Sequence, residues 1–427
     1  MMKKHYEPEC RETWYEETLN NGLYVVVFEK PDFVTTSCVL AVPYGSLDCK
    51  QTDEEGNTYS FPMGSAHFLE HKLFESDEGD AMNDFARLGA NVNAFTSYDE
   101  TCYYFDTPAD PKVPLGMLLD FVQDLSITDS SVEKEKGIIL QERHMYLQDA
   151  ESRILLETMR SLFRNYPINE DITGSDESIM AMRKKELEEC YAMNYHPGRM
   201  TLVCVTPLSA ERIFSLVEEN QAHKTFPAPK NLKRYAWEEG NKPIRDTFSL
   251  KMDVSVPRIM YGIRMPVIDK DNTARMKREW SLRMRLDSWF TSVNPQYQSW
   301  IDEGRISPYF SFEEDFYEDA QILVFADEAL DPQSFRSFLE EQLKACMNTA
   351  MQEDTLDQLK KRTMGSYLHI FDDPARLSLT MCESLMDDVS LFEEYRIVSS
   401  LTPDMIQQQV KELDFSCSTL TVLNPLE

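Results

Sequence analysis

The sequence lacks the cysteine spacings that hold small secreted proteins or thiolate metal sites together. Its nine cysteines are scattered from Cys10 to Cys417, and no two of them have the Cys-x-x-Cys spacing. An odd, dispersed set argues against a disulfide framework and against a cysteine-based metal site. We therefore expect the thiols to be reduced and mostly buried.

A long apolar run is also missing. A membrane-spanning helix needs about 18 consecutive apolar residues, and no window of this chain approaches that length. The basic residues in MMKKHYEPEC (1–10) are not followed by the apolar stretch of a secretory signal. With 427 residues, 42% of them apolar, the chain has the composition of a globular protein of two or three domains. We expect a cytoplasmic protein that does not interact with membranes.

Basic residues are scarce relative to acidic ones. The chain has 43 Lys and Arg against 74 Asp and Glu, a formal net charge of -31. Such a charge repels a phosphate backbone, so nucleic acid is not expected as a partner. Two explanations for the acidity stay open, a solvated surface that favours solubility and a cavity wall that selects cationic peptides.

The order of apolar runs predicts strands followed by helices in each half of the chain. Valine-rich runs at 22–30 and 35–46 predict two strands, and a long helix is predicted from about Ser131 to Phe163. Residues 222–243 are rich in Pro, Lys and polar side chains without a helical or alternating period. This composition predicts a linker.

Two internal similarities indicate a duplication. TLVCVTPL (201–208) resembles TLTVLNPL (419–426), and YYFDTPADPKVPLGMLLDFV (103–122) resembles ILVFADEALDPQSFRSFLEEQL (322–343). Both pairs fit one offset of about 220 residues. We therefore predict an α+β fold with two similar domains, 1–221 and 244–427, in which helices pack on mainly antiparallel sheets.

The stretch GSAHFLEHKLFE (64–75) carries a candidate metal motif. On a helix, His67, Glu70 and His71 share one face, because successive residues turn by about 100°. Imidazoles four residues apart can hold one ion, and the carboxylate between them can take a proton from water. The other residues of this helix are largely apolar, so unpaired polar groups would be costly there. The alternative to a metal site is a solvent-exposed helix face that carries three polar residues. The second half contains only His369, so it lacks this motif.

A third ligand is expected in SVEKEKGIILQERHMY (131–146). Glu135 and Glu142 are seven residues apart and therefore share a helical face. The same face is expected to carry an apolar stripe of Ile138, Ile139, Met145 and Tyr146. Carboxylates on such a stripe need a partner, and a metal ion would provide one. His144 is a competing ligand, but it points roughly 200° away from Glu142. Glu142 as an ordinary surface glutamate is the alternative.

Together these motifs resemble the insulinase/pitrilysin family of zinc peptidases, especially its bacterial members of mitochondrial-processing-peptidase size. HFLEHKLFE matches the family's inverted zinc motif, GANVNAFTSYDETCYY its following strand segment, and VEKEKGIILQER the segment with the distal glutamate. The resemblance covers nearly the whole chain and is strongest from about Gly64 to Pro197.

This resemblance implies roles for individual residues. One zinc ion per chain would be held by His67, His71 and Glu142. Glu70 would be the general base, and Glu135 the carboxylate that supports the site. These assignments are what the family pattern implies.

The resemblance also implies a mode of substrate binding. The strand around Asn93, Ala94 and Phe95 looks like the family's edge strand, which pairs with the backbone of an extended peptide. The family's two domains face each other as a clamshell around a chamber, and the second domain supplies an Arg and a Tyr. Tyr309 matches that tyrosine, whereas Asp302 stands where the arginine is expected, with Arg305 nearby.

The function that we predict is a zinc-dependent endopeptidase acting on unfolded peptides. Its partners would be peptide substrates and a second subunit, in a homodimer or in a heterodimer with a homologue that lacks the motif. The alternative is a non-catalytic peptide-binding or scaffold subunit of such a pair. Iron or manganese in oxidative chemistry is disfavoured, because no oxygenase or cofactor-binding feature lies nearby.

Overall fold

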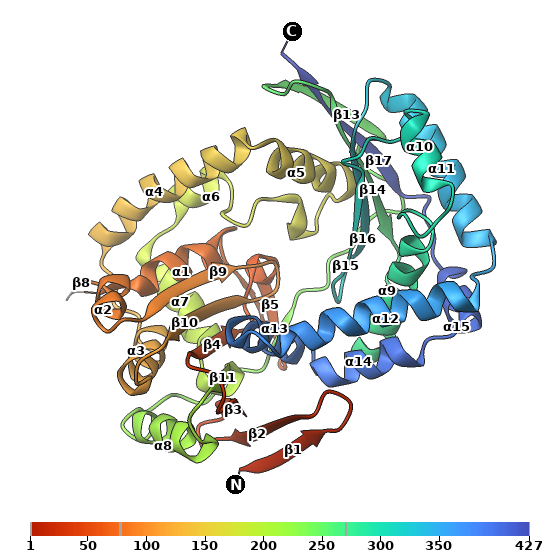
Figure 1. Cartoon of the computed structure of the whole chain (residues 1–427). Helices are drawn as coiled ribbons and strands as arrows, with labels where there is room; N and C mark the ends of the chain where they lie inside the picture. The colour runs from red at the N-terminus through yellow and green to blue at the C-terminus, as the bar shows by residue number, and fades with distance from the viewer. Residues whose placement is uncertain (1, 77–78, 270, 427) are drawn as a thin grey trace. The chain divides into compact units, whose positions relative to one another are not determined.

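The computed structural model describes residues 2–76, 79–269 and 271–426, and it divides the chain into two compact units (Figure 1). The first unit comprises the residues up to Arg143, Asp171–Tyr235 and Tyr367–Phe392. The second comprises His144–Glu170, Ala236–Ser366 and the residues from Glu393 onward. Within the described residues, every helix is too short or too polar to cross a bilayer.

A seven-stranded sheet forms the centre of the first unit. Its order is β1 (Lys3–Glu7), β2 (Glu12–Thr18), β3 (Tyr24–Glu29), β11 (Thr201–Thr206), β4 (Thr36–Val42), β10 (Thr101–Thr107) and β9 (Asn91–Thr96). Only the β3–β11 pair is parallel. All seven residues of β4 are buried, because helices cover both faces of the sheet at this strand. The strands predicted at 22–30 and 35–46 are therefore confirmed as β3 and β4.

The second unit repeats the topology of the first. Its sheet has the order β13 (Thr247–Met252), β17 (Ser418–Pro425), β14 (Arg258–Met265), β16 (Gln321–Glu328) and β15 (Ser311–Phe316). The pair β13–β17 is parallel and the other pairs are antiparallel, as in the succession β3, β11, β4, β10, β9. The similar segments 201–208 and 419–426 form the equivalent strands β11 and β17. This repetition supports the predicted duplication, and the α+β class is confirmed.

Two smaller sheets accompany the large ones. One joins β12 (Leu232–Arg234), β5 (Lys50–Asp53) and β6 (Thr58–Ser60), and the other joins β7 (Glu75–Ser76) and β8 (Gly79–Asp80). Strand β12 lies within the stretch predicted as a linker, so part of that stretch is tied to the first unit by strand pairing.

Helices make up most of the remaining structure. The first half of the chain contains α1 (Ser65–Phe74), α2 (Ala81–Arg87), α3 (Lys112–Val122), α4 (Asp129–Gln148), α5 (Ala150–Leu162), α6 (Asp176–Ala181), α7 (Lys184–Asn194) and α8 (Ala210–Gln221). The second half contains α9 (Asn272–Asp287), α10 (Tyr297–Asp302), α11 (Pro332–Asn348), α12 (Glu353–Ile370), α13 (Pro374–Met386), α14 (Leu391–Ser400) and α15 (Pro403–Val410).

Each compact unit contains a helix from the other half of the sequence: α13 belongs to the first unit and α5 to the second. Helix α13 packs against β4 and β11 of the first unit (Figure 1). The hydroxyl oxygens of Ser37 on β4 and Ser378 on α13 lie 2.8 Å apart. Helix α5 packs against β14 and β17 of the second unit. The units therefore differ from the domain ranges 1–221 and 244–427, because the apolar face of a helix does not specify which of two similar sheets it will cover.

The prediction of one long helix from Ser131 to Phe163 is wrong, because the chain forms two helices there, α4 and α5. Asp149 has extended backbone angles between α4 and α5, and its carboxylate accepts a hydrogen bond from the backbone N–H of Ser152 at 2.8 Å. Aspartate is a strong N-cap residue, so it ends one helix and starts the next.

The cysteine prediction is confirmed. All nine cysteines are free thiols, and eight of them are buried. The exception is Cys10, which is partly exposed.

Candidate metal centre

Helix α1 carries His67, Glu70 and His71, the residues of the candidate metal motif. It begins after Gly64, whose φ of 85° is in the left-handed region and whose missing Cβ leaves space for the carbonyl oxygen of Thr173. Phe68, Leu69 and Leu73 are at most 3% exposed and anchor the helix in the core of the first unit. Core packing thus fixes the orientation of the remaining helix face.

His67, His71 and Glu142 converge on one point. One potential ligand atom of each residue lies within 4.8 Å of those of the other two. Nε2 of His67 is 3.6 Å from Oε1 of Glu142, and Nε2 of His71 is 3.3 Å from its Oε2. Helices α1 and α4 thus bring together three residues that are up to 75 positions apart in the sequence. His144, the competing candidate, is exposed and outside this group.

Glu135 contacts the outer nitrogen of His71. Its Oε1 lies 3.0 Å from Nδ1 of His71, and its other oxygen lies 3.4 Å from Nζ of Lys72. The Lys72 side chain is 0% exposed and also pairs with Glu75. Sequence reasoning missed Lys72. A signal for it existed, since a lysine next to His71 in an otherwise apolar helix requires a carboxylate partner.

The contacts among these residues shift the pKa values of His71, Glu135 and Glu142. Burial alone would lower the pKa of His71, but hydrogen bonds with Glu135 and Glu142 outweigh it and raise the pKa to about 9. Hydrogen bonds from His67 and His71 hold the pKa of Glu142 well below its usual range. Burial opposes ionisation of Glu135, yet His71 and Lys72 lower its pKa overall. Both glutamates are therefore carboxylates, the form that binds a cation or accepts hydrogen bonds.

Glu70 lies on the same helix, one residue before His71. Its Oε2 accepts a hydrogen bond of 2.6 Å from the hydroxyl of Thr96, the last residue of β9. This bond connects the carboxylate to the end of the edge strand. Glu70 is only partly buried, so the carboxylate is accessible from solvent.

The prediction of an apolar stripe on α4 is wrong for three of its four residues. Ile139 is 0% exposed, but Ile138 is 45%, Met145 59% and Tyr146 37% exposed. The buried face of α4 is therefore narrower than the apolar spacing predicted, and three of the four stripe residues are exposed to solvent. Glu135 is nevertheless only 7% exposed, so a buried carboxylate does require the partners described above.

Asn93, Ala94 and Phe95 lie on β9, at one end of the first sheet. They pair with Tyr104, Tyr103 and Cys102 of β10, and the described residues place no further strand on the other side of β9. Asn93 is exposed, while Ala94 and Phe95 are partly buried. The backbone of this strand can therefore accept an additional strand.

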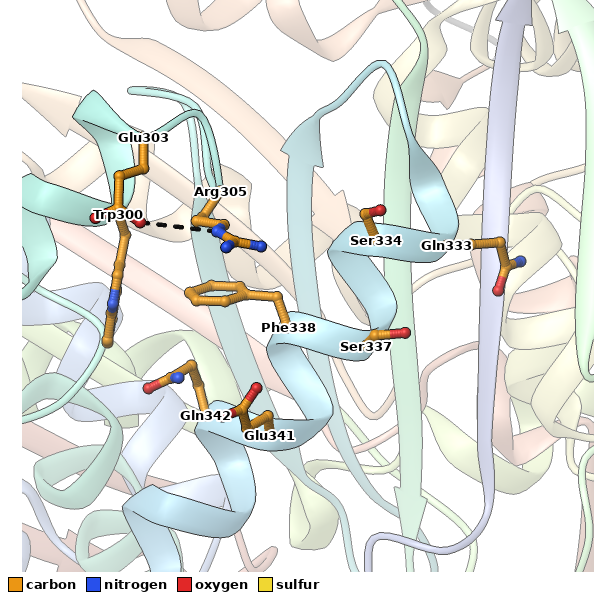
Figure 2. A pocket seen from close by; sticks show the side chains of 9 residues that line it. All are labelled: Trp300, Glu303, Arg305, Gln333, Ser334, Ser337, Phe338, Glu341 and Gln342. Atoms are coloured by element: carbon orange, nitrogen blue, oxygen red, sulfur yellow. Dashed lines mark ion pairs between the residues drawn. The ribbon is translucent and has the colours of Figure 1, made fainter.

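The second-unit candidates lie on the connection between α10 and β15. Tyr309 is 74% exposed, and its backbone N–H donates to the hydroxyl of Ser307. Figure 2 shows Arg305 and Glu303 on one side of a pocket of about 510 Å³, with residues of α11 opposite. The Arg305 guanidinium is 3.8 Å from the Glu303 carboxylate. Substrate contact by Tyr309 stays a prediction.

Comparisons with known proteins identify the class of this chain. Residues 24–176 match the family model "Insulinase (Peptidase family M16)", and residues 181–278 match "Peptidase M16 inactive domain". The chain is 31% identical over 423 residues to the uncharacterized zinc protease YmfH of Bacillus subtilis, covering 99% of this chain and 98% of that protein. The chain therefore belongs to the M16, or insulinase, peptidase family, as its motifs predicted.

Two further comparisons agree. The probable mitochondrial-processing peptidase subunit beta of Schizosaccharomyces pombe is 28% identical over 229 residues, which is 51% of this chain and 48% of that protein. The crystal structure of a putative M16-like peptidase from Alicyclobacillus acidocaldarius superimposes with a TM-score of 0.90 at 29% identity, covering 99% of this chain and 98% of the other.

The donor set fits a zinc ion. Two imidazole nitrogens and one carboxylate oxygen are the kind of ligands that catalytic zinc sites use, with a fourth position left for water or substrate. Three converging donors from α1 and α4 satisfy this requirement. Glu135 on the outer nitrogen of His71 is the supporting contact that such ligands usually have.

Proposed function

We propose that this protein is a zinc-dependent endopeptidase that hydrolyses unfolded peptides or short polypeptides. The observation that carries the proposal is the convergence of His67, His71 and Glu142 within 4.8 Å, with Glu70 on the same helix. The zinc-protease names of the relatives support it.

The residues of the site would divide the chemistry between them. A zinc ion held by His67, His71 and Glu142 would polarise the attacking water and the scissile carbonyl. Glu70 would take a proton from that water and later donate it to the leaving amine. The hydroxyl of Thr96 would hold the Glu70 carboxylate in position, and Glu135 would orient the His71 ring.

Substrate would bind as an added strand. The edge of β9 at Asn93, Ala94 and Phe95 would offer backbone groups to an extended chain, although the N–H of Ala94 already donates to Oδ1 of Asn93 at 2.9 Å. Because Thr96 follows directly and contacts Glu70, a peptide paired with β9 would run toward the general base. Tyr309 is a further proposed substrate-binding residue, and pairing with an edge strand would favour extended peptides over folded proteins.

A non-catalytic role in a pair of subunits is the second candidate. It is favoured by Asp302, which occupies the position where the family's arginine is expected. The chain would then bind peptides beside a homologous subunit, and the metal would serve structure alone. A homodimer or a heterodimer that supplies the missing group is compatible with either role.

Peptide cleavage and metal content together test the proposal. The purified protein should contain about one zinc per chain and cleave an unstructured peptide library in a chelator-sensitive way. Glu70→Gln should abolish cleavage and keep the metal, whereas His71→Ala should lose both. Full turnover by Glu70→Gln would refute the general-base role. Metal without cleavage, even after candidate partner subunits are added, would favour the second candidate.

A further inference from the structure

Lys72 is an unusual residue to find inside the core of the first unit. Its side chain is 0% exposed, although lysine is rarely buried without a partner. The neighbouring residues of α1, Leu69, Leu73 and Phe74, are all at most 9% exposed. A cation in these surroundings is stable only if carboxylates and carbonyl groups compensate for the lost water.

Three groups from two segments provide that compensation. Nζ of Lys72 pairs with the carboxylate of Glu75, lies 3.4 Å from Oε2 of Glu135 and donates to the carbonyl oxygen of Ser131 at 3.4 Å. Glu75 is 38% exposed, so water can replace Lys72 as its partner. Glu135 is 9% exposed in its side chain and does not have that freedom.

Glu135 connects Lys72 to His71. One carboxylate oxygen faces Lys72 and the other lies 3.0 Å from Nδ1 of His71, so a cation, a carboxylate and an imidazole stand in a row. A carboxylate at Nδ1 favours the tautomer with hydrogen on Nδ1, which leaves Nε2 as the ligand atom. Nε2 is the atom that lies 3.3 Å from Glu142.

The two histidines differ in this respect. Nδ1 of His67 is buried and has no hydrogen-bond partner among the described residues. Of the two rings, His71 is therefore the one whose orientation depends on a second group. Any group that fixes Glu135 acts on the metal site through this single ring.

We propose that Lys72 is a positioning residue of the metal centre, which holds Glu135 against Nδ1 of His71 and thereby strengthens His71 as a metal ligand. This inference rests on the metal-binding part of the proposed function. Lys72 touches neither the ligand atoms nor the general base, and its effect passes entirely through Glu135.

Zinc affinity of the full chain tests the inference without reference to cleavage. The variants are Lys72→Met, which keeps the length of the side chain without its charge, Glu135→Gln, and the double variant. Affinity is measured by competition with a chromophoric chelator, and the visible spectrum of the cobalt-substituted protein reports ligand geometry. Loss of a supporting contact typically weakens metal binding about 10- to 100-fold, and we expect such a loss for Lys72→Met together with an altered cobalt spectrum.

The double variant distinguishes positioning from general destabilisation. If Lys72 acts through Glu135, adding Lys72→Met to Glu135→Gln should weaken zinc binding by no more than about twofold, since contacting residues are not additive. If the loss of zinc affinity in the double variant equals the product of the losses in the two single variants, the inference is overturned. Wild-type affinity with a wild-type cobalt spectrum in Lys72→Met would also overturn it.

Lys136 offers a matched control. It is a second buried lysine, 5% exposed, but it pairs with Glu133 at 2.5 Å instead of with Glu135. Lys136→Met should leave zinc affinity within about twofold of the wild type, and an equal loss there would overturn the inference. If circular dichroism shows that Lys72→Met is unfolded, Lys72→Gln replaces it under the same criteria. A wild-type chain that binds no zinc would refute the proposed function itself.

Discussion

Thr96 donates a hydrogen bond of 2.6 Å to the carboxylate of Glu70. The bond joins the last residue of the edge strand β9 to the helix that carries the candidate metal ligands His67 and His71. This bond therefore connects the proposed peptide-binding edge to the proposed general base. Substitutions at Thr96 can show whether the bond affects the catalytic rate without affecting metal binding.

Replacing Thr96 by Val should slow catalysis without removing the metal. Val has nearly the shape of Thr but cannot donate to Glu70, and hydrogen bonds to charged groups contribute about 1.5–3 kcal/mol. We expect kcat on an unstructured peptide to fall roughly 10- to 100-fold, with the zinc content unchanged. Thr96→Ser keeps the hydroxyl and should recover most of the rate. Equal rates for the Val and Ser variants would show that the bond is irrelevant.

Zinc content should distinguish Glu142 from His144. Glu142→Ala removes one of three converging donors, so the zinc recovered by elemental analysis should fall well below one ion per chain. His144→Ala is the control two residues along the same helix, and it should keep its zinc because His144 is exposed and outside the cluster. Retention of stoichiometric zinc by Glu142→Ala would contradict the ligand assignment.

Two glycines separate the cost of backbone strain from the cost of a clash. Gly64 and Gly56 have φ values of 85° and 83°, but a Cβ on Gly64 would meet the carbonyl of Thr173, whereas Gly56 has open space around it. Left-handed backbone costs a residue with a Cβ roughly 1–2 kcal/mol, so Gly56→Ala should destabilise by about that amount. Gly64→Ala should lose distinctly more stability in urea unfolding, and zinc affinity with it. Identical unfolding midpoints would contradict this.

A buried carboxyl group should make stability depend on pH. Burial raises the pKa of Glu100 to about 8, with Asp99, Glu383 and Asp387 adding repulsion and Cys102 opposing the shift. Below about pH 4.5 the group is protonated in both the folded and the unfolded chain. As the pH rises toward 8, only the unfolded chain ionises freely, so stability falls across this window and the loss is complete above it.

Glu100→Gln should remove the part of this dependence that Glu100 causes, while Glu383, whose pKa burial raises to about 7, keeps its own part. The variant should unfold at a higher temperature than the wild type at pH 8.5, by an amount equivalent to roughly 2–4 kcal/mol, and differ little from it at pH 4.5. Glu177→Gln, at an exposed acid on α6, should show the wild-type pH profile. A Glu100→Gln protein with the wild-type profile would show that Glu100 ionises without cost.

Local patterns were sufficient to predict the elements and part of the site. The spacing of His67 and His71 defines a common helix face wherever the helix lies, and the Val-rich runs predict strands because their period is local. The repeats at 201–208 and 419–426 likewise predicted equivalent strands. The break at Asp149 was missed because a capping residue interrupts a helix without changing its apolar period.

The sequence by itself determined the family, the α+β class, and the helix face that bears His67, Glu70 and His71. Tertiary structure decided which distant groups meet that face. Only the folded chain brings Glu142 of α4 to His67 and His71 and buries Lys72 beside Glu135. Packing also decided that α5 and α13 cover different sheets from those that the chain order suggests. A helical period specifies which side chains share a face, but the partner of that face depends on contacts between residues far apart in the chain.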